Sequence, residues 1–253
     1  MPPSSVENLS LDVRRLMSYK DFLKLQASFR SDKSAAMWTR VSPKLDSLAI
    51  PVNCAGVNGG DRRALFQITC SLAPRKVLEI GTNIGASTIH IALALQINGI
   101  GNLDTIDLHN ANSEAALPGT YGQVHRKPKE MLVAIGCSHV VRFLQGDSLS
   151  FLRDGKSLYD FIFVDGDHTL SHVYQELPLA VSRLKPGGLL LLHDYFPSMK
   201  PLWSDGKVLE GVFLAVERYK MQGYELQPVP LGKLPWITKL RSRKTSLAAL
   251  CSA

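Results

Sequence analysis

Five short apolar runs in this sequence are each followed at once by residues that can bind a ligand or move a proton. In chain order these clusters are Glu79 with Gly81, Asp107, Asp147 with Ser148, Asp165 with Asp167 and His168, and His193 with Asp194. In an open parallel sheet the carboxyl ends of the strands share one edge, and ligands bind outside that edge. A single acid after a strand could simply cap the next helix. Capping alone does not explain why all five strands are followed by such clusters. The pattern therefore predicts one ligand site built from five strand ends.

A glycine turn follows the first of these runs. Gly81 and Gly85 allow the backbone to approach a ligand closely, and the helix that follows begins with unpaired N–H groups. A dinucleotide site would carry the pattern GxGxxG, whereas Asn83 and Ala86 occupy its second and third glycine positions here. Glu79, just before the turn, suits a cationic ligand better than a pyrophosphate. The turn predicts a cofactor site, but not one for a dinucleotide.

The next two clusters suit a nucleoside. Asp107 stands 26 residues after Gly81, at the end of the second run, where its carboxylate could accept hydrogen bonds from both hydroxyls of a ribose. The alternative role for Asp107 is to cap the segment that follows it. Asp147 and Ser148, after the third run, are placed to meet an adenine.

From residue 76 onward, apolar runs alternate with helical patterns, which is typical of a parallel sheet with helices on both faces. The expected parallel strands are 76–80, 103–106, 140–144, 161–164 and 189–192, and the expected helices are 87–96, 122–135, 170–184 and 208–221. Two more strands, 224–230 and 236–240, have a short link that suits an antiparallel hairpin, because a parallel pair needs a crossover of about a dozen residues. The sequence thus predicts an α/β, Rossmann-like, seven-stranded and mostly parallel sheet with one antiparallel strand.

The chain divides into three parts. Residues 1–58 are expected to be helical, as a lid or an oligomer contact, and residues 59–241 to form the α/β domain. Residues 242–253 are expected to be a basic, frayed tail.

Composition bounds the class of protein. The chain has 253 residues and a formal net charge of +7, with much of the basic excess near its C-terminal end. The remaining basic residues are spread among acids and are not interleaved with aromatic residues. The net positive charge is therefore better explained by a basic surface than by a nucleic-acid partner. Four scattered cysteines without a CxxC pair, and no secretory signal, suggest a reducing cytosol and thus a cytoplasmic protein. No apolar run approaches the roughly 20 residues of a membrane span.

Three motifs carry a resemblance to a known family. They are Val77-Leu78-Glu79-Ile80-Gly81-Thr82 with Gly85-Ala86-Ser87-Thr88, then Phe163-Val164-Asp165-Gly166-Asp167-His168-Thr169, and Leu184-Lys185-Pro186-Gly187-Gly188. From about Gly59 to Leu240 the chain resembles the class I S-adenosylmethionine-dependent methyltransferases. Within them it looks like the small-molecule O-methyltransferases related to catechol and caffeoyl-CoA O-methyltransferases, and it is similar to the antibiotic-pathway methyltransferases.

The resemblance implies a set of cofactor contacts. Glu79, Gly81 and Ser87 would hold the methionine portion of S-adenosylmethionine, Asp107 the ribose, and Asp147 with Ser148 the adenine. Asn83, Gly85 and Asp165 complete the expected cofactor site.

A metal ion is a second implication. In the catechol-type enzymes two aspartates and an asparagine hold a divalent cation. Asp165 and Asp194 match the two aspartates, but Tyr195 stands at the asparagine position. Two carboxylates and the neighbouring His193 could still hold Mg²⁺ with water completing the shell.

The expected reaction is methyl transfer to a hydroxyl of a small molecule, for instance a secondary metabolite. His168 is the first candidate for the general base and His193 the second, with Asp165 beside them, because imidazole titrates near working pH. Either histidine could instead brace a loop, and a bound metal could itself lower the pKa of the acceptor. Phe196 and Trp203 are expected to line the acceptor pocket, and the N-terminal helices suggest a homodimer.

Three alternatives remain open. An NAD-dependent oxidoreductase is disfavoured by the glycine pattern. An N-methyltransferase of a small molecule or nucleic acid is the second, although the chain lacks the Asn/Asp-Pro-Pro-aromatic motif typical of base amino-group methylators. The third is a cofactor-binding module with the same fold and no activity.

Overall fold

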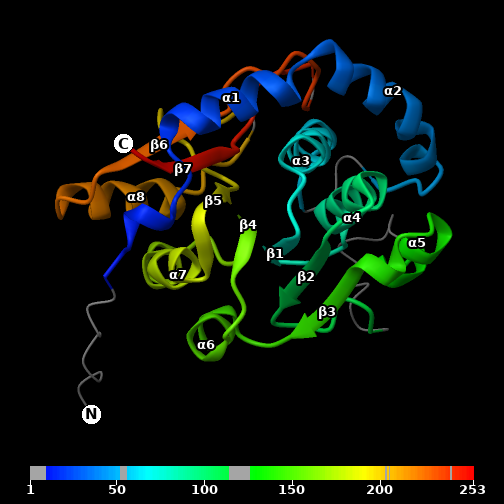
Figure 1. The fold of residues 1–253 in the computed structure, drawn as a ribbon. Coiled ribbons are helices and arrows are strands. Elements are labelled where there is room, and N and C mark those ends of the chain that lie inside the picture. The colour runs from blue at the N-terminus through cyan, green and yellow to red at the C-terminus, as the bar shows by residue number, and fades with distance from the viewer. Residues whose placement is uncertain (1–9, 52–55, 114–125, 203, 205, 240) are drawn as a thin grey trace.

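The computed structural model describes residues 10–51, 56–113, 126–202, 204, 206–239 and 241–253, and it has one seven-stranded sheet at its centre (Figure 1). The strand order is β3-β2-β1-β4-β5-β7-β6. The strands are β1 Lys76–Ile80, β2 Asn102–Asp107, β3 Val141–Gln145, β4 Tyr159–Val164, β5 Leu184–Leu192, β6 Leu226–Pro230 and β7 Ala248–Ser252. The first five are parallel, and β7 runs antiparallel to both β5 and β6. The predicted fold class is confirmed, including its single antiparallel strand.

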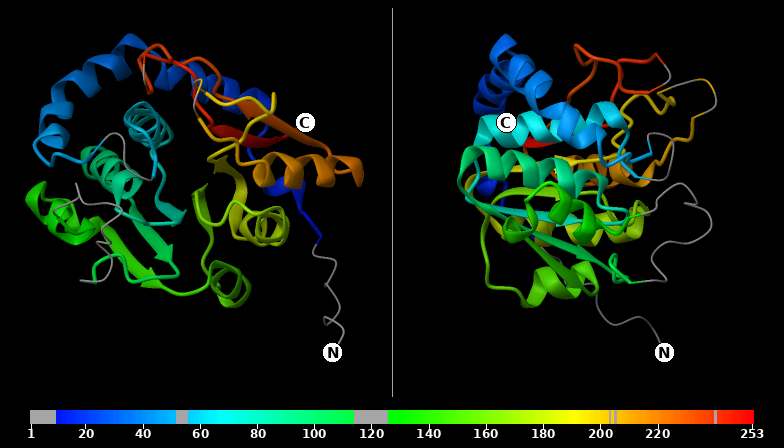
Figure 2. Two further views of the ribbon diagram at one scale, coloured as in Figure 1. Left: turned by 180° about the vertical axis from the view of Figure 1, so that it is seen from behind. Right: turned by 90° about the vertical axis from the view of Figure 1, so that its right-hand side faces the viewer.

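Eight α-helices are described. They are α1 Tyr19–Phe29, α2 Asp32–Asp46, α3 Gly59–Leu72, α4 Ala86–Asn98, α5 Pro128–Ala134, α6 Ser148–Asp154, α7 Leu170–Ser182 and α8 Gly211–Met221. Helices α6, α7 and α8 cover one face of the sheet, while α3 and α4 cover the other (Figures 1 and 2). Helix α5 begins at Pro128, later than the predicted helix 122–135, of which residues 122–125 lie outside the described part.

The two faces of the sheet have separate apolar cores because successive strand side chains point to opposite faces. Leu78 and Ile162 belong to the core under α7 and α8, whereas Val77, Phe161 and Phe163 belong to the core under α1, α3 and α4. Their burial on both faces is why these strands read as continuous apolar runs rather than as alternating ones.

The C-terminal strand is the main correction to the sequence prediction. Residues 236–239 do not form the predicted strand 236–240, whose last residue lies outside the described part, and the strand that pairs with β6 is β7. The expectation that residues 242–253 fray is wrong, since Ala248, Leu250 and Cys251 have no exposed surface. A five-residue strand that lies between two others forms backbone hydrogen bonds with both neighbours, and both of its faces are buried. The α/β unit therefore extends beyond residue 241.

The N-terminal helices also join this unit. Phe22, Leu25 and Phe29 of α1 are buried in the same core as Leu189 and Leu191 of β5. Figure 1 shows α1 lying alongside β7, although the two are far apart in sequence. A role for residues 1–58 as a lid or an oligomer contact stays a prediction. Among the described residues, no helix is long and apolar enough to cross a membrane.

Candidate functional site

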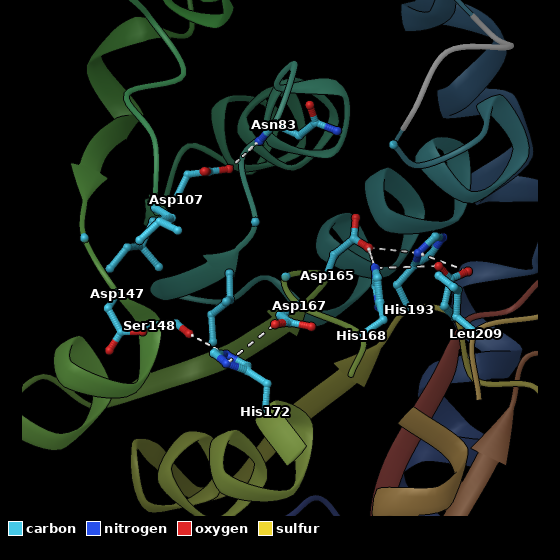
Figure 3. Close-up of a pocket in the computed structure, with 18 residues that line it drawn as sticks. Asn83, Asp107, Asp147, Ser148, Asp165, Asp167, His168, His172, His193 and Leu209 are labelled. Atoms are coloured by element: carbon cyan, nitrogen blue, oxygen red, sulfur yellow. Dashed lines mark hydrogen bonds and ion pairs between the residues drawn. The ribbon is translucent and has the colours of Figure 1, made fainter. Parts of the chain in front are cut away.

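A cavity of about 640 Å³ opens at the carboxyl edge of the sheet, where the predicted clusters converge (Figure 3). Its lining includes nine of the predicted site residues: Gly81, Asn83, Asp107, Asp147, Ser148, Asp165, His168, His193 and Asp194. The predicted residues Glu79, Gly85 and Ser87 do not line it. The lining has two ends (Figure 3). We call Asp107, Asp147, Ser148 and His172 the Asp107 end, and Asp165, His168, His193 and Asp194 the Asp165 end.

The turn after β1 lies against the end of the neighbouring strand β4 too closely for any residue but glycine. Gly81 has φ of +95°, and a Cβ there would lie 2.1 Å from the carbonyl oxygen of Asp165. Two residues on, Asn83 takes a left-handed conformation with φ of +46°, and its N–H donates to Oδ2 of Asp107 at 2.8 Å. Gly81 and Asn83 both line the cavity, and Gly81 adds no side chain to it.

Glu79 lies behind this turn rather than in the cavity. It has no exposed surface, and its Oε2 accepts hydrogen bonds from the hydroxyls of Thr88 and Thr105. Its Oε1 has no hydrogen-bond partner in the part of the chain that the structure describes. Burial raises the pKa of Glu79 to about 7, although the hydroxyls of Ser87, Thr105 and Thr88 oppose the rise. Glu79 and Ser87 therefore support the turn from beneath.

At the Asp107 end, the two carboxylates are held by backbone amides. Asp107 accepts from the N–H groups of Asn83 and His109, at 2.8 and 3.0 Å. Asp147 caps α6 by accepting from the N–H of Ser150 at 2.8 Å, and this bond lowers the pKa of Asp147. Both residues line the cavity while accepting from backbone amides, and the contact of Asp107 with a ribose stays a prediction.

Sequence reasoning missed two residues near this end, His172 and Glu176. Ser148 donates to Oε1 of Glu176 at 2.5 Å, and Nε2 of His172 lies 3.2 Å from the same oxygen. His172 lines the cavity, and its Nδ1 lies 3.9 Å from Oδ2 of Asp167 (Figure 3). His172 and Glu176 stand four residues apart on α7, a spacing that brings side chains together on one helix face and could have signalled the pair.

At the Asp165 end, carboxylates and imidazoles alternate. Nδ1 of His193 lies 2.9 Å from Oδ1 of Asp165 and 3.5 Å from Oδ1 of Asp194. Nε2 of His168 lies 3.7 Å from both Oδ1 of Asp165 and Oδ2 of Asp194. These contacts are within ion-pair distance, and all four side chains line the cavity. The structure thus brings together the predicted catalytic residues.

Two further residues, from distant segments, support this cluster. Asp61 of α3 is fully buried, with Oδ2 at 3.7 Å from Nε2 of His193. Ser246, just before β7, donates its hydroxyl to Oδ1 of Asp194 at 3.1 Å. Burial by itself lowers the pKa of His193, but the charges of Asp165 and Asp194 outweigh it and hold that pKa well above its usual value. Burial would raise the pKa of Asp194, but the positive charge of His193 outweighs this effect and holds that pKa below its usual value.

The cluster does not fit the magnesium site that the resemblance suggested. Asp165 and Asp194 do come together, but imidazoles rather than further oxygen ligands adjoin them. Tyr195, at the asparagine position, is buried with its ring against Phe213 at a centroid distance of 5.6 Å. Within the described ranges, no three His, Cys, Asp or Glu side chains converge as metal ligands. Since Mg²⁺ prefers a nearly octahedral shell of oxygens, this donor set suits it poorly.

The predicted aromatic lining is only partly testable. Phe196 is buried and is not among the lining residues, so this expectation is wrong, and Trp203 lies outside the described residues. Leu108 and Leu209 supply apolar lining instead, and both are exposed.

The charge of the lining is strongly one-sided. Asp107, Asp147, Asp165, Asp167 and Asp194 line the cavity together with three histidines, and no lysine or arginine is among the described lining residues. The chain as a whole is basic, so its net charge and the charge of its cavity have opposite sign. Such a cavity attracts a cation and repels a phosphate.

Comparison with known proteins gives a consistent result. Residues 78–195 match the family described as a methyltransferase domain. Caffeoyl-CoA O-methyltransferase 1 from Zea mays is 27% identical over 146 residues, covering 55% of this chain and 50% of that protein. The chain thus spans about half the length of the curated relative it matches. The predicted resemblance to methyltransferases is confirmed.

Solved structures share the fold. The O-methyltransferase TomG from Streptomyces achromogenes, in complex with SAM, aligns with a TM-score of 0.54 and 16% identity, over 96% of this chain and 100% of that chain. The O-methyltransferase from Bacillus cereus, in complex with SAH, aligns with a TM-score of 0.55 and 16% identity, over 93% and 98%. At these identities the likeness is one of fold.

Proposed function

We propose that this protein binds S-adenosylmethionine and transfers its methyl group to a hydroxyl of a small molecule, a function that the match of residues 78–195 to the methyltransferase-domain family supports. The observation that carries the proposal is the charge of the cavity. S-adenosylmethionine bears positive charge at its sulfonium and amino groups, and five aspartates without a described lysine or arginine complement that charge. The same lining would repel the pyrophosphate of a dinucleotide, which argues against the oxidoreductase alternative.

The roles proposed for the cofactor contacts follow the lining. We assign the methionine portion to the lining beside Gly81 and Asn83, and the ribose hydroxyls to the carboxylate oxygens of Asp107. Glu79 lies beneath the turn, where its charge in the ionised state would favour a cation above it. Ser87 and Gly85 shape the turn and the start of α4.

S-adenosylmethionine, when bound, supplies an electrophilic methyl group. The acceptor hydroxyl must lose its proton at or before the attack, and a residue of this chain must take it. We assign that step to Nε2 of His168, which faces the cavity between Asp165 and Asp194. The two carboxylates stabilise the imidazolium that forms when His168 gains the proton.

His193 is the weaker candidate for the base. Its side chain is nearly buried, and its two nitrogens face carboxylates, Asp165 on one side and Asp61 on the other. An imidazole in that position already favours its protonated form. We propose that His193 fixes Asp165 and Asp194 in place, while His168 moves the proton. Because the donor set does not fit Mg²⁺, no step passes through a metal.

The acceptor is proposed to be small and partly apolar. Leu108 and Leu209 are exposed apolar residues in a lining that also holds Ile80 and Ile106, which favours a ring or short chain bearing the hydroxyl. A cytoplasmic location and a homodimer remain predictions.

Calorimetry with S-adenosylhomocysteine tests the proposal. Wild-type protein should bind, and Asp107→Ala should bind at least about tenfold more weakly, because hydrogen bonds to a charged group are lost. Asp154→Ala, which removes an exposed carboxylate at the end of α6, is the matched control and should bind like the wild type. Absence of binding by the wild type would refute the methyltransferase proposal outright.

A further inference from the structure

Glu176 on α7 is a fully buried carboxylate near the Asp107 end of the cavity. Its Oε1 is shared between the hydroxyl of Ser148, at 2.5 Å, and Nε2 of His172, at 3.2 Å. Its Oε2 has no hydrogen-bond partner in the described part of the chain. Burying a carboxylate is costly, so its presence here calls for a role beyond packing.

The buried carboxylate fixes the direction of the hydrogen bonds around it. A carboxylate can only accept, so Ser148 must use its single O–H to donate to Glu176. Nε2 of His172 also lies 3.2 Å from the hydroxyl oxygen of Ser148, so one lone pair of Ser148 faces that histidine and the other remains for a ligand. Nε2–H of His172 likewise donates to Glu176, and this bond raises the pKa of His172 and favours a proton on Nδ1 as well. Oδ2 of Asp167, 3.9 Å from Nδ1, favours the same proton.

The cavity end therefore presents an acceptor, Ser148, next to a donor, His172, and both line the cavity. The Watson–Crick edge of adenine offers the complementary pair, an amino group that donates and a ring nitrogen that accepts. Hypoxanthine, which has an oxygen in place of the amino group, offers the pair in reverse. A site discriminates strongly between two such bases when the wrong base leaves buried polar groups of the site without hydrogen-bond partners.

We propose that Ser148, His172 and Glu176 form the element that makes the cavity selective for adenine, with Glu176 setting the direction of the other two. Glu176 is a positioning residue because it does not line the cavity. This inference rests on the proposed function, which brings S-adenosylmethionine to the cavity, and it assigns roles to His172 and Glu176 that the motifs did not suggest.

Isothermal titration calorimetry with S-adenosylhomocysteine and S-inosylhomocysteine tests it, because the two ligands differ only at this edge of the base. Wild-type protein should prefer the adenine ligand by at least about tenfold, the size of one or two neutral hydrogen bonds. In Glu176→Gln the new amide can donate to Ser148, so Ser148 can turn its O–H outward. The preference should then fall to within about threefold.

The matched control is Glu217→Gln, the same substitution in a surface pair with Lys220 on α8, which should keep the wild-type preference. If Glu176→Gln does not fold, as judged by circular dichroism, Ser148→Ala provides the same readout by removing the acceptor. Equal affinity of the wild type for both ligands, or an unchanged preference in the variants, overturns the inference. Failure of the wild type to bind S-adenosylhomocysteine would instead overturn the proposed function on which it rests.

Discussion

The two ends of the cavity hold their carboxylates in different ways. At the Asp107 end, Asp107 and Asp147 accept hydrogen bonds from backbone amides, namely those of Asn83, His109 and Ser150. At the Asp165 end, Asp165 and Asp194 lie against two imidazoles, and the cluster draws on α3 and on the segment before β7. Backbone amides hold a carboxylate in place but take up no proton from it, whereas the imidazoles of a carboxylate–imidazole cluster can accept and release a proton. The first arrangement suits binding and the second suits chemistry.

The largest expected effect separates these two roles at His168. His168→Ala should lower kcat by about 10²- to 10⁴-fold, the usual contribution of a general base, and leave the Kd for S-adenosylhomocysteine nearly unchanged. Single-turnover kinetics and calorimetry measure the two quantities. The control is His139→Ala, an exposed histidine before β3. If His168→Ala kept its turnover, the proposal that the Asp165 end carries the chemistry and the Asp107 end the binding would be contradicted.

A second prediction concerns Glu79, behind the Asp107 end. Its pKa is about 7 in the folded protein against an ordinary value of 4.5, so the folded state holds this proton more tightly than the unfolded state. The free energy of unfolding without ligand should therefore fall as the pH rises from about 4.5 to 7, by about 2–3 kcal/mol from this residue.

Urea denaturation at pH 5 and pH 8 checks the point. Glu79→Gln cannot titrate, so its loss of stability between the two pH values should be smaller than that of the wild type by that amount. Equal losses in the two proteins would mean that Glu79 is already ionised in the ligand-free fold.

A smaller effect is expected at Ser246, which reaches the Asp165 end from the segment before β7. Ser246→Ala removes a hydrogen bond to Asp194 and should lower kcat by about two- to tenfold, with the Kd for S-adenosylhomocysteine unchanged. The control is Ser182→Ala, whose hydroxyl bonds a carbonyl of its own helix α7. A change in cofactor affinity in Ser246→Ala would show that the two ends are not separate.

The smallest effect is expected from removing metal. Treatment with EDTA followed by gel filtration should leave kcat within about twofold, and added Mg²⁺ should not raise it, because the donor set at the Asp165 end suits Mg²⁺ poorly. Activity that disappears with EDTA and returns with Mg²⁺ would contradict both this prediction and the role of His168.

Much of the fold and about half of the site follow from local sequence. The strand–turn–helix around Gly81 depends on residues within a few positions of each other, and the close approach to Asp165 leaves glycine as the only choice. The acids at the strand ends could be assigned to one edge because parallel strands share their direction. Those inferences hold in the structure, since nine predicted residues line one cavity.

Contacts between distant segments could not be predicted in the same way. Residues 248–252 form a small apolar run without alternation, and nothing local indicates that it enters the sheet between β5 and β6. Asp61 meets His193, and Ser246 meets Asp194, only once the sheet has assembled and both segments are buried against it.

The sequence by itself therefore determined the class of the fold, the turn after β1 and the acidic edge that favours a cation. These depend on backbone conformation and on period-two or helical patterns, which neighbouring residues specify. Only the tertiary structure decided which strand closes the sheet, which carboxylates face His168, and that Glu79 lies beneath the turn instead of in the cavity. Those features depend on burial and on side chains that meet across long stretches of chain, where a local pattern carries no information.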